Sequence, residues 1–195
     1  MKTIVLLDID GTIVPTRHPW TTVQLRGLQE FDLIVPPYAP TIVRVRPAVI
    51  EAINAWHTAG VDIRWLTSWG WKAHWLARAI GLPDLELFYD PSPGEIFMYA
   101  RSQRPWKRFA VSDAAEDDWE APIRVVWIDN EPATGQTRYL EQNLAAMHFN
   151  IAEVRIVRPD EERGMTLKDL RRAAALLGVN PPSGQSTGTR KSVQE

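Results

Sequence analysis

Acidic and hydroxyl side chains follow three apolar segments that lie far apart in the chain. They are Asp8 and Asp10 after "IVLL", Thr67 and Ser68 after "IRWL", and Asp129, Asn130 and Glu131 after "VVWI". If these segments are parallel strands of one sheet, their carboxyl ends open onto a single crevice. Carboxylates gathered there repel one another unless a cation lies among them, and an all-oxygen donor set favours Mg²⁺ over zinc. Such a site would also hold a phosphate group.

Donors for phosphate oxygens accompany the acids. The candidates are hydroxyl and backbone N–H groups: those of Thr67, Ser68, the stretch 9–12 and a helix N-terminus near Gly70. A phosphate site also needs a fixed positive charge. Between the second and third apolar segments the sequence offers two lysines, Lys72 and Lys107, and either can fill this role.

Each of these positions also has a simpler interpretation. Asp10 and Gly11 could form only the turn of a hairpin whose strands are residues 4–7 and 13–14. Thr67 could cap the next helix, and Asp129 could be a turn residue at the end of a strand. The hairpin interpretation leaves the polar residues after the other two segments unexplained, so we expect a shared site.

The apolar pattern predicts an α/β fold. Buried strands are expected at 4–7, 61–66, 125–128 and 152–157, with a short strand near "LELFYD". Helical spacing predicts helices over 47–60, 71–81, 137–149 and 166–178, the last with Thr166 as its N-cap and Gly178 at its end. Alternating strands and helices indicate a Rossmann-like three-layer structure, with a parallel sheet covered on both faces.

Two regions depart from this alternation. Residues 15–47 contain "VQLRGL" and "TIVRVRP" on either side of Pro36, which predicts a small β-hairpin flap. Residues 180–195 have the composition of a linker, so we expect a mobile tail after one domain that spans 1–179.

Composition limits the class of protein. The chain has 195 residues, of which 45% are hydrophobic, and a formal net charge of -2, which fits one globular domain and not a generally basic, nucleic-acid-coating protein. The absence of cysteine excludes thiolate catalysis and Cys-ligated zinc and fits a reducing compartment. No apolar run approaches the length of a membrane span, so we expect a cytoplasmic protein without membrane association.

Histidines and tryptophans have mainly structural interpretations. The four histidines show no metal-ligand spacing and are expected to be structural or on the surface: His18, His57, His74 and His148. Most of the nine tryptophans are expected to pack in the interior. Trp69 differs, because it follows the hydroxyls of the second segment and could stack on a base or sugar. The stretch "RSQRPWKRF" mixes basic and aromatic residues, but the acidic "DAAEDDWE" follows closely and offsets its charge.

The polar residues together resemble the four motifs of the haloacid dehalogenase (HAD) superfamily. The matching features are "DIDGT", a strand ending in Thr67, a later lysine and a strand ending in Asp129, in that order over residues 3–131. More closely, "WLTSWGWKAHWLARAIGLP", "VVWIDNEP" and "RPDEERGMTLKDL" are similar to the small, capless HAD domains of Swiss Army Knife RNA-repair proteins and their stand-alone relatives.

The resemblance implies a phosphatase that works through an aspartyl-phosphate. By similarity, Asp8 attacks phosphorus, and Asp10 protonates the leaving oxygen and then activates water. Mg²⁺ would be held by the carboxylates of Asp8 and Asp129 and the main-chain carbonyl of Asp10. The remaining roles are catalytic contacts from Thr67 and Lys107, and substrate binding by Ile9, Gly11, Thr12, Ser68 and Trp69.

The sequence departs from the family at Asn130, where a second acid is often found. We expect Glu131 to take that outer role through water, which adjusts the metal affinity. The alternative is a non-catalytic, phosphate-binding or regulatory module that has kept the fold.

The substrate class follows from the missing cap. Many members of the HAD superfamily carry a large cap domain inserted after the first or the second motif. The corresponding regions of this sequence, 15–47 and the stretch between Ser68 and Lys107, are too short for such a domain, which leaves an open crevice. We therefore expect a large phosphorylated substrate, with a nucleic-acid end as the leading class and a small nucleotide or sugar phosphate as the second. The sequence does not specify the oligomeric state or a kinase or ligase partner.

Overall fold

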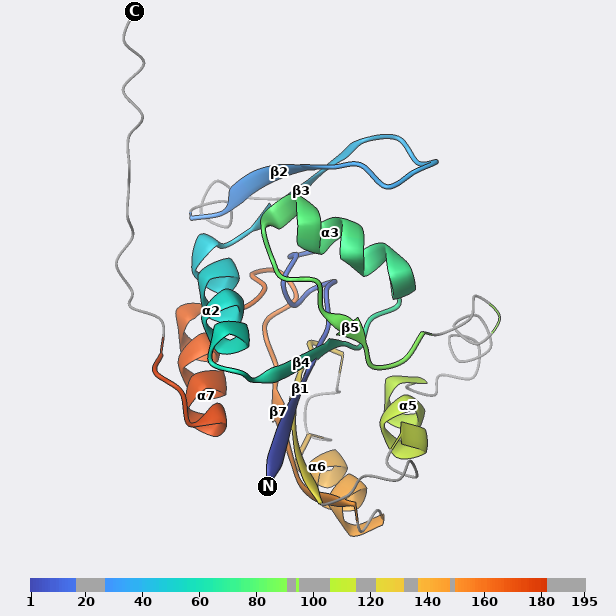
Figure 1. Cartoon of the computed structure of the whole chain (residues 1–195), viewed down its shortest axis with the longest axis vertical. Helices are drawn as coiled ribbons and strands as arrows, with labels where there is room; N and C mark the ends of the chain where they lie inside the picture. The colour runs from blue at the N-terminus through green and yellow to red at the C-terminus, as the bar shows by residue number, and fades with distance from the viewer. Residues whose placement is uncertain are drawn as a thin grey trace, which may run out of the picture.

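The computed structural model describes residues 1–16, 27–90, 94, 106–114, 122–131, 137–147 and 150–181. Figure 1 shows these residues in colour along the chain. Two expectations fall partly outside them: the tail 180–195, of which 182–195 are not described, and the basic stretch 101–109, of which 101–105 are not described.

One parallel sheet forms the centre of the molecule. Its strands, in spatial order, are β5 (Glu86–Leu87), β4 (Asp62–Trp65), β1 (Lys2–Leu7), β6 (Ile123–Ile128) and β7 (Ile151–Val157). Every neighbouring pair is parallel, which confirms the predicted strands and the α/β class. The hairpin interpretation of the opening residues is wrong, because β1 pairs with β4 and β6 instead of folding back on residues 13–14.

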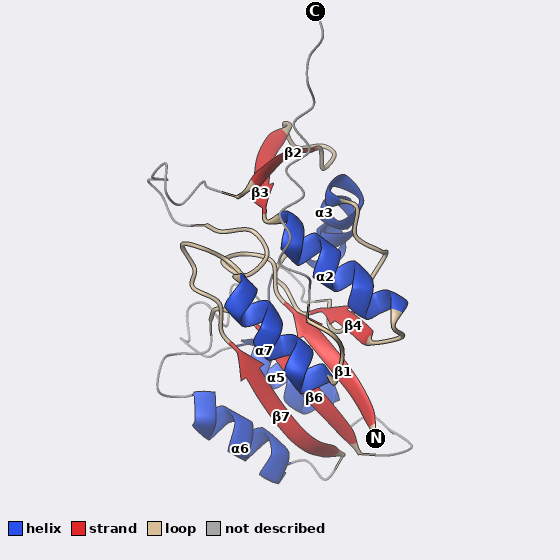
Figure 2. Cartoon of the chain, turned by 90° about the vertical axis from the view of Figure 1, so that its left-hand side faces the viewer, coloured by secondary structure: helices blue, strands red, loops and turns tan. Residues whose placement is uncertain are grey.

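Helices cover both faces of the sheet. On one face lie α2 (Pro47–Thr58), α3 (Ala73–Ile80) and α7 (Leu167–Leu177); on the other lie α5 (Trp106–Ala114) and α6 (Thr137–Met147). A short 3₁₀ turn, η1 (Gly70–Lys72), precedes α3. Figure 2 views the α2 and α7 side of this three-layer arrangement. None of the helices in the described part of the chain has both the length and the apolar character needed to span a bilayer.

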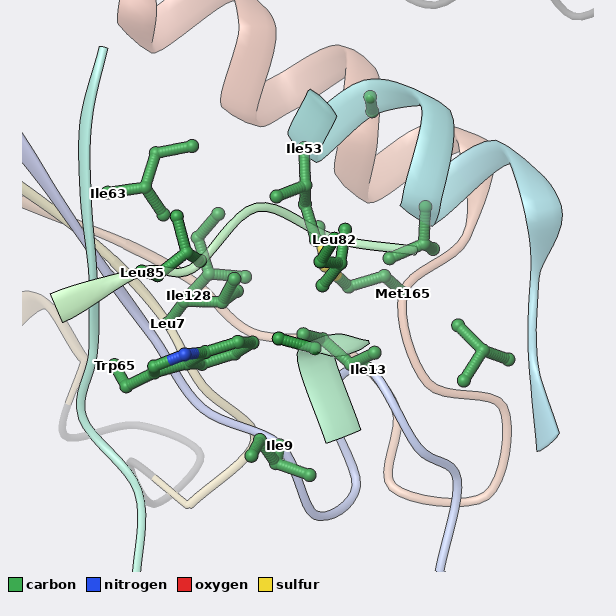
Figure 3. Close-up of a cluster of buried hydrophobic side chains, with 14 of the residues drawn as sticks. Leu7, Ile9, Ile13, Ile53, Ile63, Trp65, Leu82, Leu85, Ile128 and Met165 are labelled. Carbon is green, nitrogen blue, oxygen red and sulfur yellow. The ribbon is translucent and has the colours of Figure 1, made fainter. Parts of the chain in front are cut away.

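Side-chain alternation along the strands builds two cores. Val5 and Leu7 of β1 pack in the core beneath α2, α3 and α7, whereas Ile4 and Leu6 pack toward α5 and α6. Figure 3 shows the first core, in which Leu7, Trp65 and Ile128 from three strands gather with Ile53 of α2. Asp8 directly follows β1 and Asp129 directly follows β6, and both contact Lys107 of α5 on that second side of the sheet.

The predicted helix ends are largely confirmed. The Asp169 carboxylate accepts hydrogen bonds from both the backbone N–H and the hydroxyl of Thr166, which fixes the start of α7. Gly178 ends the same helix with a φ of 68°, in the left-handed region. Helix α5 was not among the predicted helices.

The flap is a two-stranded antiparallel hairpin of β2 (Gln29–Leu33) and β3 (Thr41–Val45). The second strand was predicted, but the first lies later than the predicted stretch 23–28, of which 23–26 fall outside the described residues. A cis Pro36–Pro37 bond lies between the two strands. Leu33, Val43 and Val45 are buried in the first core, so this core anchors the hairpin, which lies at the opposite end of the molecule from residue 1 (Figure 1).

Core packing gives a first prediction. Ile53 on α2 is fully buried against the sheet, whereas Glu51 on the same helix is exposed. Ile53→Ala should therefore lower the free energy of unfolding by about 2–5 kcal/mol, and Glu51→Ala should change it by less than about 0.5 kcal/mol. Urea unfolding followed by circular dichroism measures both, and equal effects would contradict this assignment of the core.

Candidate active site

Strand register brings the first and third acidic segments together. Leu7 pairs with Ile128 on one side and with Trp65 on the other, and the backbone N–H of Asp8 donates to the Ile128 carbonyl at 3.1 Å. Asp8 therefore lies beside Asp129. The sheet continues from β1 through β4 and β5 on one side and through β6 and β7 on the other. The strand order therefore reverses between β1 and β6, and in open parallel sheets the crevice lies at this point, beyond the carboxyl ends of the strands.

A buried ammonium group joins the two acids. Lys107, in the first turn of α5, places its Nζ 2.9 Å from Asp8 Oδ1 and 2.9 Å from Asp129 Oδ2. The same nitrogen lies 3.3 Å from Oε2 of the more exposed Glu131. Lys72, the other candidate, instead contacts Tyr38 on the hairpin. The structure thus brings Lys107, and not Lys72, to the acids.

The site carries more negative than positive charge. Burial, and then the neighbouring Asp129 carboxylate, raise the pKa of Asp8 to about 8, although Lys107 acts in the opposite direction. Burial also disfavours the charged form of Lys107, but the charges of Asp129, Asp8 and Glu131 outweigh it and hold the pKa of the lysine above its usual value. The three acids have one ammonium among them, and a further cation would favour the charged form of Asp8 and so lower its pKa.

Three donors fix the Asp129 carboxylate. Its Oδ2 accepts from Lys107 Nζ at 2.9 Å and from the indole N–H of buried Trp127 at 3.0 Å, and its Oδ1 accepts from the backbone N–H of Glu131 at 2.7 Å. Oδ2 then has both lone pairs in use, whereas Oδ1 keeps one. Sequence reasoning did not identify Trp127 as part of the site; its position two residues before Asp129, on the same face of β6, was the available signal.

A compact turn over residues 9–14 supports Asp8. The N–H of Gly11 donates to the Val14 carbonyl and the N–H of Thr12 to the Ile9 carbonyl. The Thr12 hydroxyl donates to Asn130 Oδ1 at 3.3 Å and accepts from the Asn130 N–H at 3.2 Å. The donors of Gly11 and Thr12 that were expected to meet substrate are therefore engaged within the protein. These hydrogen bonds brace the turn, and the substrate-binding role of Gly11 and Thr12 stays a prediction.

Asn130 and Glu131 have distinct positions. Asn130 ties the end of β6 to Thr12, and its carbonyl accepts a bond from Arg158 at 2.9 Å. Glu131 reaches Lys107, which is compatible with its expected outer role. The side chain of Ile9 is fully buried in the core, so only its backbone can serve a substrate.

Asp10 and the second segment lie on the open side of the site. Asp10 is exposed, and its Oδ2 accepts a hydrogen bond from the indole N–H of Trp69 at 2.8 Å. Thr67 is buried, and its hydroxyl accepts from the Trp69 backbone N–H at 3.4 Å, which does not use the hydroxyl's own proton. Ser68 is exposed beside them.

The donor set fits a divalent cation that prefers oxygen. Asp8 and Asp129 present buried carboxylate oxygens, and the main-chain carbonyl of Asp10 follows on the same turn. Within the ranges that the structure describes, no group of three or more His, Asp or Glu side chains is arranged to hold a metal ion. Of the histidines, His57 is exposed and His74 contacts Asp84, as expected, whereas His18 and His148 fall outside the described residues.

Comparison with protein-family models and with curated proteins gives no match to this sequence. The assignment of the site therefore depends on its geometry and chemistry.

Replacing Lys107 should destabilise the protein more than replacing Lys72. Lys107→Met would leave two buried carboxylates without a counter-charge, which costs about 3–5 kcal/mol of unfolding free energy. Lys72→Met removes a contact with an exposed tyrosine and should cost less than about 1 kcal/mol. Urea unfolding in the presence of a metal chelator compares the two variants. Equal stability would show that Lys107 does not hold the acids together.

Gly11 should be required by its close contact with Asn130. Its φ is 69°, and a Cβ there would lie 2.5 Å from Asn130 Nδ2. Gly11→Ala should cost at least about 2 kcal/mol, through left-handed strain and this clash. In an Asn130→Ala background the same change should cost about 1 kcal/mol less, since the clash is gone. An unchanged cost in that double-mutant cycle would contradict the close approach.

Proposed function

We propose that this protein is a Mg²⁺-dependent phosphomonoester hydrolase of the haloacid dehalogenase type. The observation that carries the proposal is the buried Lys107 ammonium, which contacts Asp8 after β1 and Asp129 after β6. The resemblance to HAD motifs assigns those three residues to one phosphate-binding centre. Their contact in the structure supports this assignment, as does the nearby exposed Asp10.

The side chains can carry out phosphoryl transfer in two steps. In the first, an Asp8 oxygen attacks phosphorus, the bond between phosphorus and the ester oxygen breaks, and Asp10 gives its proton to the leaving oxygen. In the second, water attacks the aspartyl-phosphate, Asp10 takes the water's proton, and phosphate leaves Asp8. The Thr67 hydroxyl would donate to a phosphate oxygen, and Lys107 would keep its proton throughout and offset the negative charge.

Residues for the metal are available. Asp8, the free lone pair of Asp129 Oδ1 and the Asp10 carbonyl would hold Mg²⁺, with Glu131 acting through water. The ion would offset the charge shared among the carboxylates and reduce repulsion between Asp8 and an anionic phosphate. Because Lys107 and the Trp127 indole occupy Asp129 Oδ2, the free lone pair of Oδ1 would be the one available to the ion.

The substrate class we propose is a phosphorylated nucleic-acid end or another large substrate. Between β1 and α2 the described residues form the β2–β3 hairpin, and these described residues add no large cap over the crevice. A small nucleotide or sugar phosphate is the second class. We place the activity in the cytoplasm, in keeping with the cysteine-free sequence.

Turnover of a generic aryl phosphate tests the chemistry. The wild-type protein should release phosphate with Mg²⁺ and lose this activity with a chelator. Asp8→Asn should reduce kcat by at least about a thousandfold, because the amide is a poor nucleophile. Asp32→Asn, the same substitution on the exposed outer part of the hairpin, is the matched control and should retain the wild-type rate.

The alternative, a non-catalytic phosphate-binding module, gives a different result. Calorimetry would then show Mg²⁺ or phosphate binding to the folded protein without turnover at any Mg²⁺ concentration. Equal rates for the wild type and Asp8→Asn would contradict the nucleophile assignment itself.

A further inference from the structure

A cavity of about 300 Å³ lies between the hairpin and the loop after β4. Leu33, Val35 and Tyr38 line it from the hairpin side, and Asp10, Trp69 and Lys72 line it from the other side. Its volume is at the lower end of the range for small-molecule sites, which suits part of a larger ligand.

Asp10 connects this cavity to the proposed reaction. Its carboxylate lines the cavity and is held by the Trp69 indole N–H at 2.8 Å. A general acid must lie within hydrogen-bond reach of the leaving oxygen. Given the proposed function, on which this inference rests, the part of the substrate that leaves with that oxygen would extend into the cavity.

The walls of the cavity offer a ring and a cation. Tyr38 is 57% exposed, and Lys72 Nζ lies 3.1 Å from its hydroxyl and 4.5 Å from its ring centre. Over the ranges described, no carboxylate forms an ion pair with Lys72, in contrast to Lys107, which contacts three. The ammonium of Lys72 is therefore available to a negative group beside an aromatic surface.

We propose that this cavity is the leaving-group subsite, and that Tyr38 and Lys72 select a leaving group with a flat ring and a second negative charge. Removal of one phosphoryl group from a nucleoside 3′,5′-bisphosphate releases a nucleoside monophosphate, which has both: its base can stack on Tyr38, and its remaining phosphate can pair with Lys72. The apolar Leu33 and Val35 complete the hairpin wall. A highly hydrated sugar phosphate would gain little from contact with these side chains.

Binding measured without turnover tests the subsite. In the Asp8→Asn background, calorimetry compares adenosine 3′,5′-bisphosphate with adenosine 5′-phosphate and ribose 5-phosphate in the presence of Mg²⁺. The bisphosphate should bind best. Adding Lys72→Met should weaken its binding about tenfold, whereas Lys168→Met, at an exposed position on α7, should leave it unchanged. Tyr38→Leu should remove about a tenfold preference for the nucleoside over ribose 5-phosphate, and Tyr38→Phe should keep it.

The outcomes separate this inference from the proposed function. Aryl phosphatase activity with unchanged ligand preferences in the Lys72 and Tyr38 variants would overturn the subsite and leave the phosphatase standing. Ligand preferences that depend on these residues in a protein without turnover would support a nucleotide-binding cavity, and would overturn both the phosphatase and the leaving-group role of the cavity. Equal binding of a phosphoserine peptide of the same charge would overturn the nucleotide assignment.

The same nucleotide unit could come from a nucleic-acid end or from a free nucleotide, and the length of the oligonucleotide distinguishes the two. Tighter binding of a 5′-phosphorylated oligonucleotide than of the free bisphosphate would support the subsite with a nucleic-acid end as its source. Equal affinity would support it with a free nucleotide as the source.

Discussion

The ammonium of Lys107, buried between the carboxylates of Asp8 and Asp129, is the interaction on which the site depends. The acids come from strands that are adjacent in space and more than a hundred residues apart in sequence, and the lysine comes from a helix on one face of the sheet. Strand pairing sets the spacing of the acids, and the position of α5 determines whether they are neutralised. Changes in either the sheet or α5 therefore act on the site directly.

The buried charges around this contact have a cost in free energy. Burial and charge crowding raise the pKa of Asp8 to about 8, which means that the fold holds this carboxylate at a cost in free energy. Hydrophobic packing of β1 and β6 on both faces can offset that cost, since every residue from Ile4 to Leu7 is fully buried. The polar residues around the acids fall into two groups. Thr12, Asn130 and Trp127 bond to the residues that hold the acids, whereas Asp10 and Lys72, which bond to Trp69 and Tyr38, also line a cavity.

The sequence was sufficient to predict the parallel sheet, because its strands are short apolar runs between helices with clear end signals. It also predicted that Asp8 and Asp129 would meet, since the carboxyl ends of parallel strands share an edge of the sheet. Helix α5 was missed because its apolar positions, Trp106, Ala110 and Val111, are few and follow a Pro- and Arg-rich stretch. The resemblance favoured Lys107 over Lys72, and the structure places Lys107 at the acids. The bracing roles of Gly11 and Thr12 needed the structure, because hydrogen bonds between distant segments leave no periodic pattern. Tyr38 was not singled out, since nothing in its local sequence shows that the hairpin would bring it to Lys72.

The most direct test of the account is whether Asp8 becomes phosphorylated. The protein would be mixed with a phosphomonoester and Mg²⁺, quenched in acid within the first turnovers, and digested for mass spectrometry of the peptide that contains Asp8 and Asp10. The account predicts a peptide heavier by one phosphoryl group, with fragment ions that place the group on Asp8 and not on Asp10. Turnover without a phosphoryl group on Asp8, or with the group on another residue, would contradict it.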